Sequence, residues 1–173
     1  MALKIRKPSS PPTQDVPLAE RIASSFKQLA GSSQEVNAAA EDLCNNLAPV
    51  NRALRKLSLG VSAWHKFAGH EDENGNYWTR DIGYVKVGTE WGIALRRTSG
   101  NEFSDQHDED VWLFKDAPRW MQIDSVSKIP DLFDELIKRT DETVKKLQAK
   151  ALQAKELSEA LNAAIAELSV QGK

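Results

Sequence analysis

Cysteine is almost absent from this sequence. Cys44 stands alone among 173 residues, so the chain cannot form an internal disulfide. That usage is typical of a reducing compartment, and we expect a cytoplasmic protein. Long apolar runs are missing too: no stretch of eighteen apolar residues exists, so we expect no membrane-spanning helix. Residues 1–14 carry Lys4, Arg6 and Lys7 without the apolar core of a signal peptide, and their Pro and Ser content predicts a disordered basic tail.

An excess of positive charge is also lacking. The formal net charge is −2, and residues 61–128 hold eight Lys or Arg against twelve Asp or Glu, a net of −4. Binding to a phosphate backbone requires a basic surface, because the affinity comes largely from the release of counterions. We therefore expect no nucleic-acid partner and no attraction to an anionic membrane.

Recognisable catalytic motifs are absent. The sequence contains no GxSxG, no P-loop, no GxGxxG and no CxxC, so neither a nucleophile elbow nor a phosphate-binding loop is present. Asp81 beside Arg80, and Glu90 before Trp91, could each take part in acid–base chemistry, but no nucleophile accompanies them. We predict no catalytic residue and no cofactor, and a non-enzyme is favoured over an enzyme.

What the sequence does contain is two long segments with helical periodicity. Apolar or small residues recur at alternating steps of three and four across residues 15–59 and again across residues 129–168, which predicts two helices that each offer a narrow stripe to another helix. We call these stripes the seams. The first seam comprises Ile22, Phe26, Leu29, Ser33, Val36, Ala40, Leu43, Leu47, Val50, Leu54 and Leu57. The second comprises Phe133, Leu136, Thr140, Val144, Leu147, Ala151, Ala154, Ser158, Leu161, Ile165 and Leu168.

The two seams match when they are aligned antiparallel. Residues whose numbers sum to about 190 then face each other, so that large residues meet large ones and small ones meet small ones over eleven layers. Leu43 faces Leu147, for example, and Ala40 faces Ala151. This agreement predicts one antiparallel coiled-coil hairpin, here called the stalk, with a bend near Pro49.

Residues 60–128 have a different composition. All five tryptophans and both tyrosines fall in this segment, in short stretches that alternate apolar and polar residues. Asn74-Gly75 predicts a tight hairpin turn, because both residues tolerate positive φ. We expect strands in 61–67, 77–87, 91–97 and 110–114, and a short helix before Pro130. The prediction is a four-stranded antiparallel meander, here called the head, with the tryptophans as part of its core.

A polar loop is expected at residues 99–110, between the third and fourth strands. Its carboxylates and His107 could bind a divalent cation, but their spacing matches no calcium loop, so a solvated acidic loop is favoured and no metal site is predicted. An aromatic residue on such a loop either packs against the head or contacts a partner. The candidate partner-binding residues are Phe103, Asp105, His107, Asp108 and Glu109.

The predicted architecture is α+β: a long antiparallel two-helix coiled-coil hairpin with an inserted four-stranded antiparallel β-sheet head, and a tail at 169–173. The predicted function is non-catalytic protein–protein interaction or scaffolding. A two-helix stalk hides its seam only partly, so we expect self-association as a homodimer or binding to a helical protein. The alternative is a small enzyme whose active site lies in the cleft between head and stalk.

Overall fold

The computed structural model describes residues 17–104 and 107–171, with side chains as far as residue 166. The chain divides into two units, residues 1–43 and residues 44–173, and each is considered by itself. In the first unit the described residues form the larger part of helix α1 (Leu18–Leu57). Its large apolar side chains are exposed, namely Leu18, Ile22, Phe26, Leu29 and Val36.

The described residues of the second unit form the end of α1, a sheet and four further helical segments. The strands are β1 (Ala63–Glu71), β2 (Asn76–Val87), β3 (Glu90–Asn101) and β4 (His107–Leu113). A 3₁₀ turn (η1, Phe114–Asp116), helix α2 (Arg119–Ser125) and a second 3₁₀ turn (η2, Val126–Lys128) lead into helix α3 (Ile129–Gln171). Helix α1 passes Pro49 without interruption and ends where Ser58 and Gly60 take φ values of 46° and 66°.

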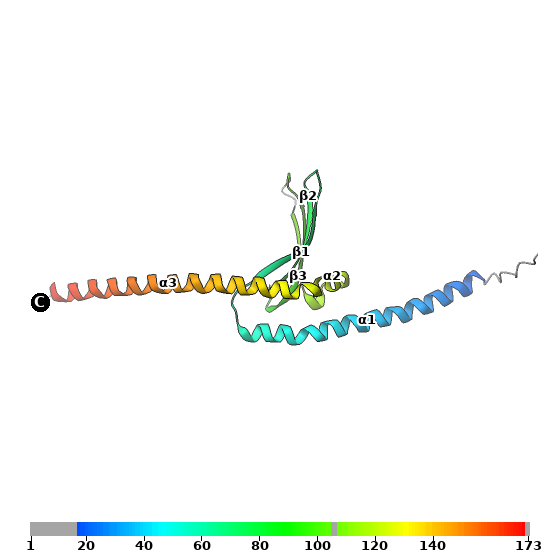
Figure 1. The fold of residues 1–173 in the computed structure, drawn as a ribbon, viewed down its shortest axis with the longest axis horizontal. Coiled ribbons are helices and arrows are strands. Elements are labelled where there is room, and N and C mark those ends of the chain that lie inside the picture. Colours follow the sequence, from blue (N-terminus) through cyan, green and yellow to red (C-terminus); the bar gives the residue numbers. More distant parts are fainter. Residues whose placement is uncertain (1–16, 105–106, 172–173) are drawn as a thin grey trace, which may run out of the picture. The chain divides into compact units, whose positions relative to one another are not determined.

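The sheet is antiparallel and its strand order, β1-β2-β3-β4, follows the sequence. Consecutive strands therefore form hairpins, and the β1–β2 and β3–β4 turns lie together at one end (Figure 1). The α+β class and the four-stranded antiparallel sheet are confirmed. The predicted loop at 99–110 was too long, because β3 continues to Asn101 and β4 begins at His107.

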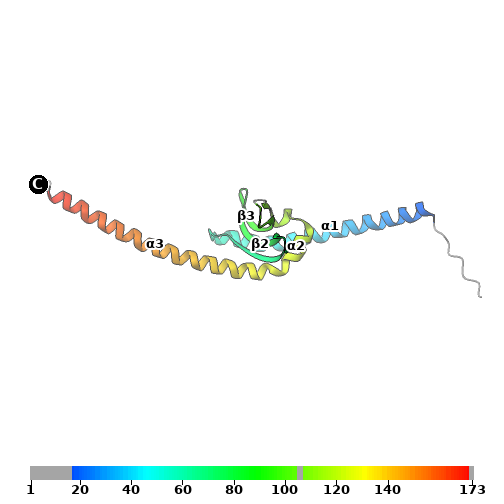
Figure 2. The ribbon, with the colours of Figure 1, turned by 90° about the horizontal axis from the view of Figure 1, so that it is seen from above.

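The core lies where α2 and α3 meet the sheet. Ile82, Ile93 and Leu95 from the strands are almost completely buried, as are Met121 from α2 and Leu132 from α3. Figure 2 shows the first part of α3 running beside the sheet, where it contacts β1 and β2. Aliphatic side chains, rather than tryptophans, fill the centre of this core. The prediction of core tryptophans was therefore wrong in part: Trp120 is 41% exposed and the other four are half-buried.

Three of the tryptophans instead pair with arginines, on both faces of the sheet. On one face the Arg80 guanidinium lies 4.6 Å from the ring centroid of Trp78 and 4.2 Å from that of Trp120 on α2. On the other, Arg96 lies 4.4 Å from the ring centroid of Trp64 and forms an ion pair with the buried Asp81 at 3.3 Å. Such cation–π contacts hold amphipathic rings at the rim of a small core.

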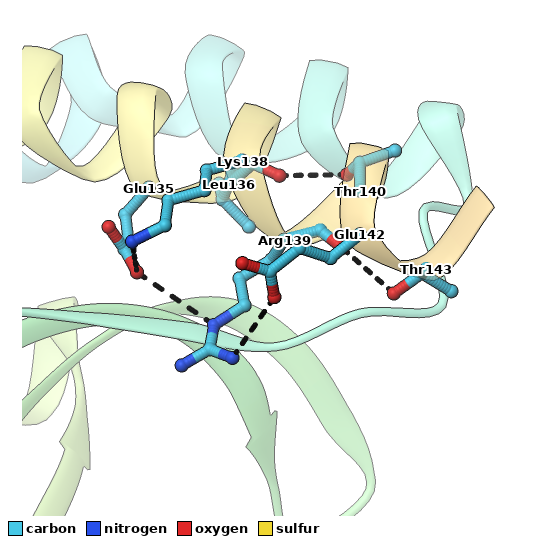
Figure 3. Close-up of polar contacts among 7 residues, drawn as sticks. All are labelled: Glu135, Leu136, Lys138, Arg139, Thr140, Glu142 and Thr143. Atoms are coloured by element: carbon cyan, nitrogen blue, oxygen red, sulfur yellow. Dashed lines mark hydrogen bonds and ion pairs between the residues drawn. The ribbon is translucent and has the colours of Figure 1, made fainter. Parts of the chain in front are cut away.

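Helix α3 continues beyond the sheet as a helix with a charged surface. Arg139 forms ion pairs with Glu135, four residues earlier, and with Glu142, three residues later, at 3.8 and 3.5 Å (Figure 3). The Glu135–Arg139 pair places an acid four residues before a base, which is the order that supports a helix. Among the helices of the described residues, none is long and apolar enough to cross a bilayer.

The structure does not confirm the predicted coiled-coil hairpin. Val144, Leu147, Leu161 and Ile165 of the α3 seam are exposed, by 44 to 63%, and Leu168 lies outside the residues with described side chains. At the base of the head, Leu54 and Leu136 are buried. The pairing of the two seams beyond that point stays a prediction.

Candidate partner-binding surface

The β1–β2 turn is held by Asp72. Its Oδ1 atom accepts hydrogen bonds from the backbone N–H groups of Asn74 and Asn76, at 2.9 and 3.0 Å, while Gly75 supplies a φ of 73°. The hydrogen bond from the Asn76 side chain, and then those from the two backbone N–H groups, lower the pKa of Asp72, because they stabilise its ionised form. A turn is therefore present at Asn74-Gly75 as predicted, but of these two residues only Gly75 takes a positive φ, and the turn is ordered by a carboxylate.

The two turns at this end of the sheet are joined by Asn101. Its Nδ2 group donates to the carbonyl oxygen of Asn74 at 3.0 Å and to Oδ1 of Asn76 at 2.7 Å. The N–H of Glu102 donates to the carbonyl of Gly75 at 2.9 Å. We call the two joined turns, residues 72–76 and 101–104, the tip.

Phe103 lies on this tip. Its backbone N–H donates to Asn101 Oδ1 at 2.8 Å, and its ring lies so close to Gly75 that a Cβ there would be 2.6 Å from Phe103 Cε2. Gly75 is buried by this contact, yet the phenylalanine remains 79% exposed. One face of the ring thus rests on glycine while most of it meets solvent, which is the arrangement of an aromatic contact residue.

His107 is placed near the tip by a glycine. In the register of the sheet, Gly100 of β3 stands between Tyr77 of β2 and His107 of β4. Because Gly100 has no side chain, the Tyr77 hydroxyl reaches across it to His107 Nδ1, at 3.0 Å. This contact ties the first residue of β4 to β2.

The other predicted residues do not form one cluster. Asp105 lies outside the described residues. Asp108 and Glu109 are both exposed, but neighbours on a strand point to opposite faces, so they cannot act together. Glu109 forms an ion pair with Arg96 at 3.7 Å. Of the five predicted residues, Phe103 lies on the tip, and His107 lies at the start of β4, where it contacts Tyr77.

Metal binding finds no support in the described part of the chain. Within residues 17–104 and 107–171, no group of three or more His, Cys, Asp or Glu side chains converges closely enough to hold an ion.

A hollow that the sequence analysis did not identify lies beside Glu90. It belongs to the second unit and has a volume of about 260 Å³. Glu90 accepts a hydrogen bond from Arg55, and Lys115 Nζ lies 3.5 Å from its other oxygen. These cations lower the pKa of Glu90, chiefly through the bond to Arg55. A carboxylate held ionised in this way is a weak general base.

The sequence contained one hint of this hollow. Glu90 was named there as a possible acid–base residue, but Arg55 and Lys115 lie 35 and 25 positions away along the chain. No spacing rule joins residues at such distances, so only the folded chain shows that they meet.

Comparison of the chain with protein-family models, with curated proteins and with solved structures gave no match.

Proposed function

We propose that this protein is a non-catalytic interaction or scaffolding protein. Its two long helices pair antiparallel along their seams and assemble as a homodimer, while the tip of the head binds a protein partner. The observation that carries the proposal is the exposure of large apolar side chains at helical spacing. In α3, Leu147 is 63% exposed, Leu161 62% and Ile165 52%. Apolar area of this kind favours association, because covering it removes it from water.

The head-proximal end of the seams supports the pairing. In the second unit, Leu57 and Leu59 line a shallow groove together with Phe133, Leu136 and Ile137. The first layers of the antiparallel alignment place Leu57 against Phe133. The following layers of the alignment pair large residues with large ones and small residues with small ones, farther from the head along both helices.

Apolar residues outside the seam favour more than two helices. Leu152 and Leu157 of α3 are 61% and 67% exposed, and neither belongs to the stripe that would face α1. A single partner helix covers one stripe, so these residues require a second contact. A second copy of the hairpin, packed against the first, covers both sets and makes a four-helix assembly.

The assembly is tested with matched lysine substitutions on opposite sides of α3. Leu147→Lys puts a charge into the seam, whereas Ala149→Lys puts the same charge on the opposite face, where the residue is exposed. We expect the wild type and Ala149→Lys to have twice the chain mass by light scattering after size exclusion, and Leu147→Lys to shift toward the monomer. A wild type that stays monomeric at all concentrations contradicts the proposal.

The recognition role of the head is tested at Phe103. Because its side chain is 79% exposed, Phe103→Ala should change the free energy of unfolding by less than about 1 kcal/mol. We expect Phe103→Ala to crosslink to fewer proteins of the native cell extract than wild type does. Lys145→Ala is the control and should crosslink to the same proteins as wild type. Equal retention by both variants would remove the tip from the proposal.

A small enzyme is the alternative, and the hollow beside Glu90 is the observation that favours it. The hollow has a carboxylate and two cations at one side, as a site for an anionic substrate would have. The lowered pKa of Glu90 weighs against proton abstraction by this residue.

A further inference from the structure

The hollow beside Glu90 has an unusual charge for this protein. Its walls come from the last turns of α1, the start of β3 and the segment that follows β4, all within the unit of residues 44–173. Arg52, Arg55 and Lys115 line it, and Glu90 is the one acidic residue among its lining side chains. The hollow is therefore net positive although the whole chain carries −2.

Its remaining surface is largely apolar. Leu47 comes from α1, Ile93 from β3, Leu113 from the end of β4 and Phe114 from η1. Asn51 fixes the wall by accepting a hydrogen bond from the Ile93 N–H at 2.8 Å. Cations at the rim and apolar side chains below suit a molecule with an anionic group at one end and a hydrocarbon part at the other.

One carboxylate already contacts these cations, and it is the side chain of Glu90. Glu90 accepts from Arg55 through one oxygen and lies 3.5 Å from Lys115 Nζ through the other. An arginine and a lysine in this geometry fit the two oxygens of a carboxylate group. Arg52 also lines the hollow, is exposed, and forms no ion pair with any described residue, so its charge is available.

We propose that this hollow binds a small amphipathic carboxylate, with Arg52, Arg55 and Lys115 around the anionic group and Ile93 and Phe114 against the hydrocarbon chain. Its volume of about 260 Å³ lies below the range of about 300–1,000 Å³ of common ligand pockets, which favours a short chain. Glu90 competes with the ligand for the same cations. This binding site lies apart from the tip, and it shares Leu47 with the first seam.

The test is a titration of the ¹⁵N-labelled full chain with octanoate, followed by amide chemical shifts. We expect saturable shifts at Glu90, Ile93 and Phe114, and a markedly weaker response to octanamide, which lacks the charge, and to acetate, which lacks the chain. Equal binding of octanamide contradicts the proposal. Shifts confined to the exposed seam of α3, near Leu147, contradict it as well, because they indicate adsorption to apolar helix surface.

Three variants add a quantitative check. Glu90→Gln removes the competing carboxylate, so octanoate should bind more tightly, by roughly one and a half to five times, as expected for the loss of an exposed ion pair. Arg52→Gln should weaken binding by a similar factor without disturbing any ion pair described above. Lys145→Gln, on the exposed surface of α3, is the matched control and should leave the affinity unchanged.

The fold of each variant is checked by its melting temperature. If Glu90→Gln lowers the melting temperature, the octanoate affinity of Arg52→Gln alone tests the proposal. A folded Arg52→Gln protein that binds octanoate as tightly as the Lys145→Gln control overturns the proposal.

Discussion

The absence of a side chain decides the local structure at several positions in the head. At Gly83 the indole of Trp64 lies flat on the strand, so that an added Cβ would be 2.3 Å from Trp64 Cε3 and 2.7 Å from the carbonyl oxygen of Ala63. Arg96 covers the other part of the same ring. Glycine is required here for close approach rather than for a special backbone angle.

Gly83→Ala should therefore destabilise the head. The new methyl group meets both a ring and backbone, so neither a rotamer change nor a small shift removes the clash, and we expect a loss of about 1–3 kcal/mol in urea unfolding. Gly31→Ala is the control, because its Cβ meets nothing within 4 Å and alanine is the better helix former. A Gly83→Ala protein as stable as wild type would falsify the packing described for Trp64.

The ion pairs of Glu90 give stability a dependence on pH. Arg55, and then Lys115, lower the pKa of Glu90 below its ordinary value of 4.5 in the folded chain. A carboxyl whose folded pKa is lowered stabilises the fold above the unfolded pKa and loses that contribution as the pH falls through the folded value. The contribution is thus complete above pH 4.5 and disappears below it.

Melting temperatures of wild type and Glu90→Gln, measured between about pH 3 and pH 7, should separate at neutral pH and converge below pH 4.5. The pKa of Asp72 is lowered as well, but Asp72 is present in both proteins. The difference between their melting temperatures therefore reports on Glu90. A constant difference across this range would show that the ion pairs contribute nothing.

At the scale of elements, one arginine joins α2 to the sheet. Arg80 of β2 lies between the rings of Trp78 and Trp120 and forms an ion pair with Asp124 at 3.5 Å, so a single side chain joins a strand to a helix of seven residues. A helix this short has little stability of its own and depends on such tertiary contacts.

Arg80→Lys should loosen α2 although it keeps the charge. An ammonium group lacks the planar face that stacks between two indoles, and we expect a loss of about 1–2 kcal/mol together with a change in tryptophan fluorescence. Arg97→Lys is the matched control, because Arg97 is the cross-strand neighbour of Arg80 and is exposed. It should alter stability by less than about 0.5 kcal/mol. Equal effects of the two substitutions would contradict the role given to the stack.

The elements of the head could be predicted because their signals are local. Alternation over YWTRDIGYVKV and the turn residues Asn74-Gly75 are sufficient to place β2 and the first hairpin. The extended ends of β3 and β4 could not be predicted, because their residues are polar on both faces where the sheet projects beyond its core.

The candidate sites were less predictable. Phe103 could be singled out as an aromatic in a polar loop, but its contact with Gly75 joins two turns that lie 28 residues apart in sequence, a relation that follows only from the strand order. The hollow beside Glu90 depends on four separate elements, α1, β3, β4 and η1. In both cases the tertiary arrangement brings together residues that no sequence pattern connects.

At the scale of the whole molecule, the pairing of the two seams is the central prediction. Ala40 and Ala151 form one of its small-residue layers, and cysteines at facing positions there would have their Cβ atoms within the reach of a disulfide. In a Cys44→Ser background, Ala40→Cys with Ala151→Cys should oxidise within one chain and migrate as a crosslinked monomer on non-reducing gels.

The control for this crosslink replaces Ala149 instead of Ala151, which moves the second thiol to the opposite face of α3. It should stay reduced under the same mild oxidation. A crosslinked dimer from the Ala40–Ala151 pair would show that the seams meet between chains, and no crosslink from either pair would contradict the hairpin.

The strand order has a consequence for how this protein matures on the ribosome. Each strand pairs only with its predecessor or successor, so the sheet can complete its backbone ladders soon after residue 113 leaves the exit tunnel. Leu132 and Leu136, which cover the inner face, are synthesised later. For that interval the inner face has only the end of α1 beside Ile93 and lacks the cover of α3, so the nascent chain is then most vulnerable to aggregation and most dependent on chaperones.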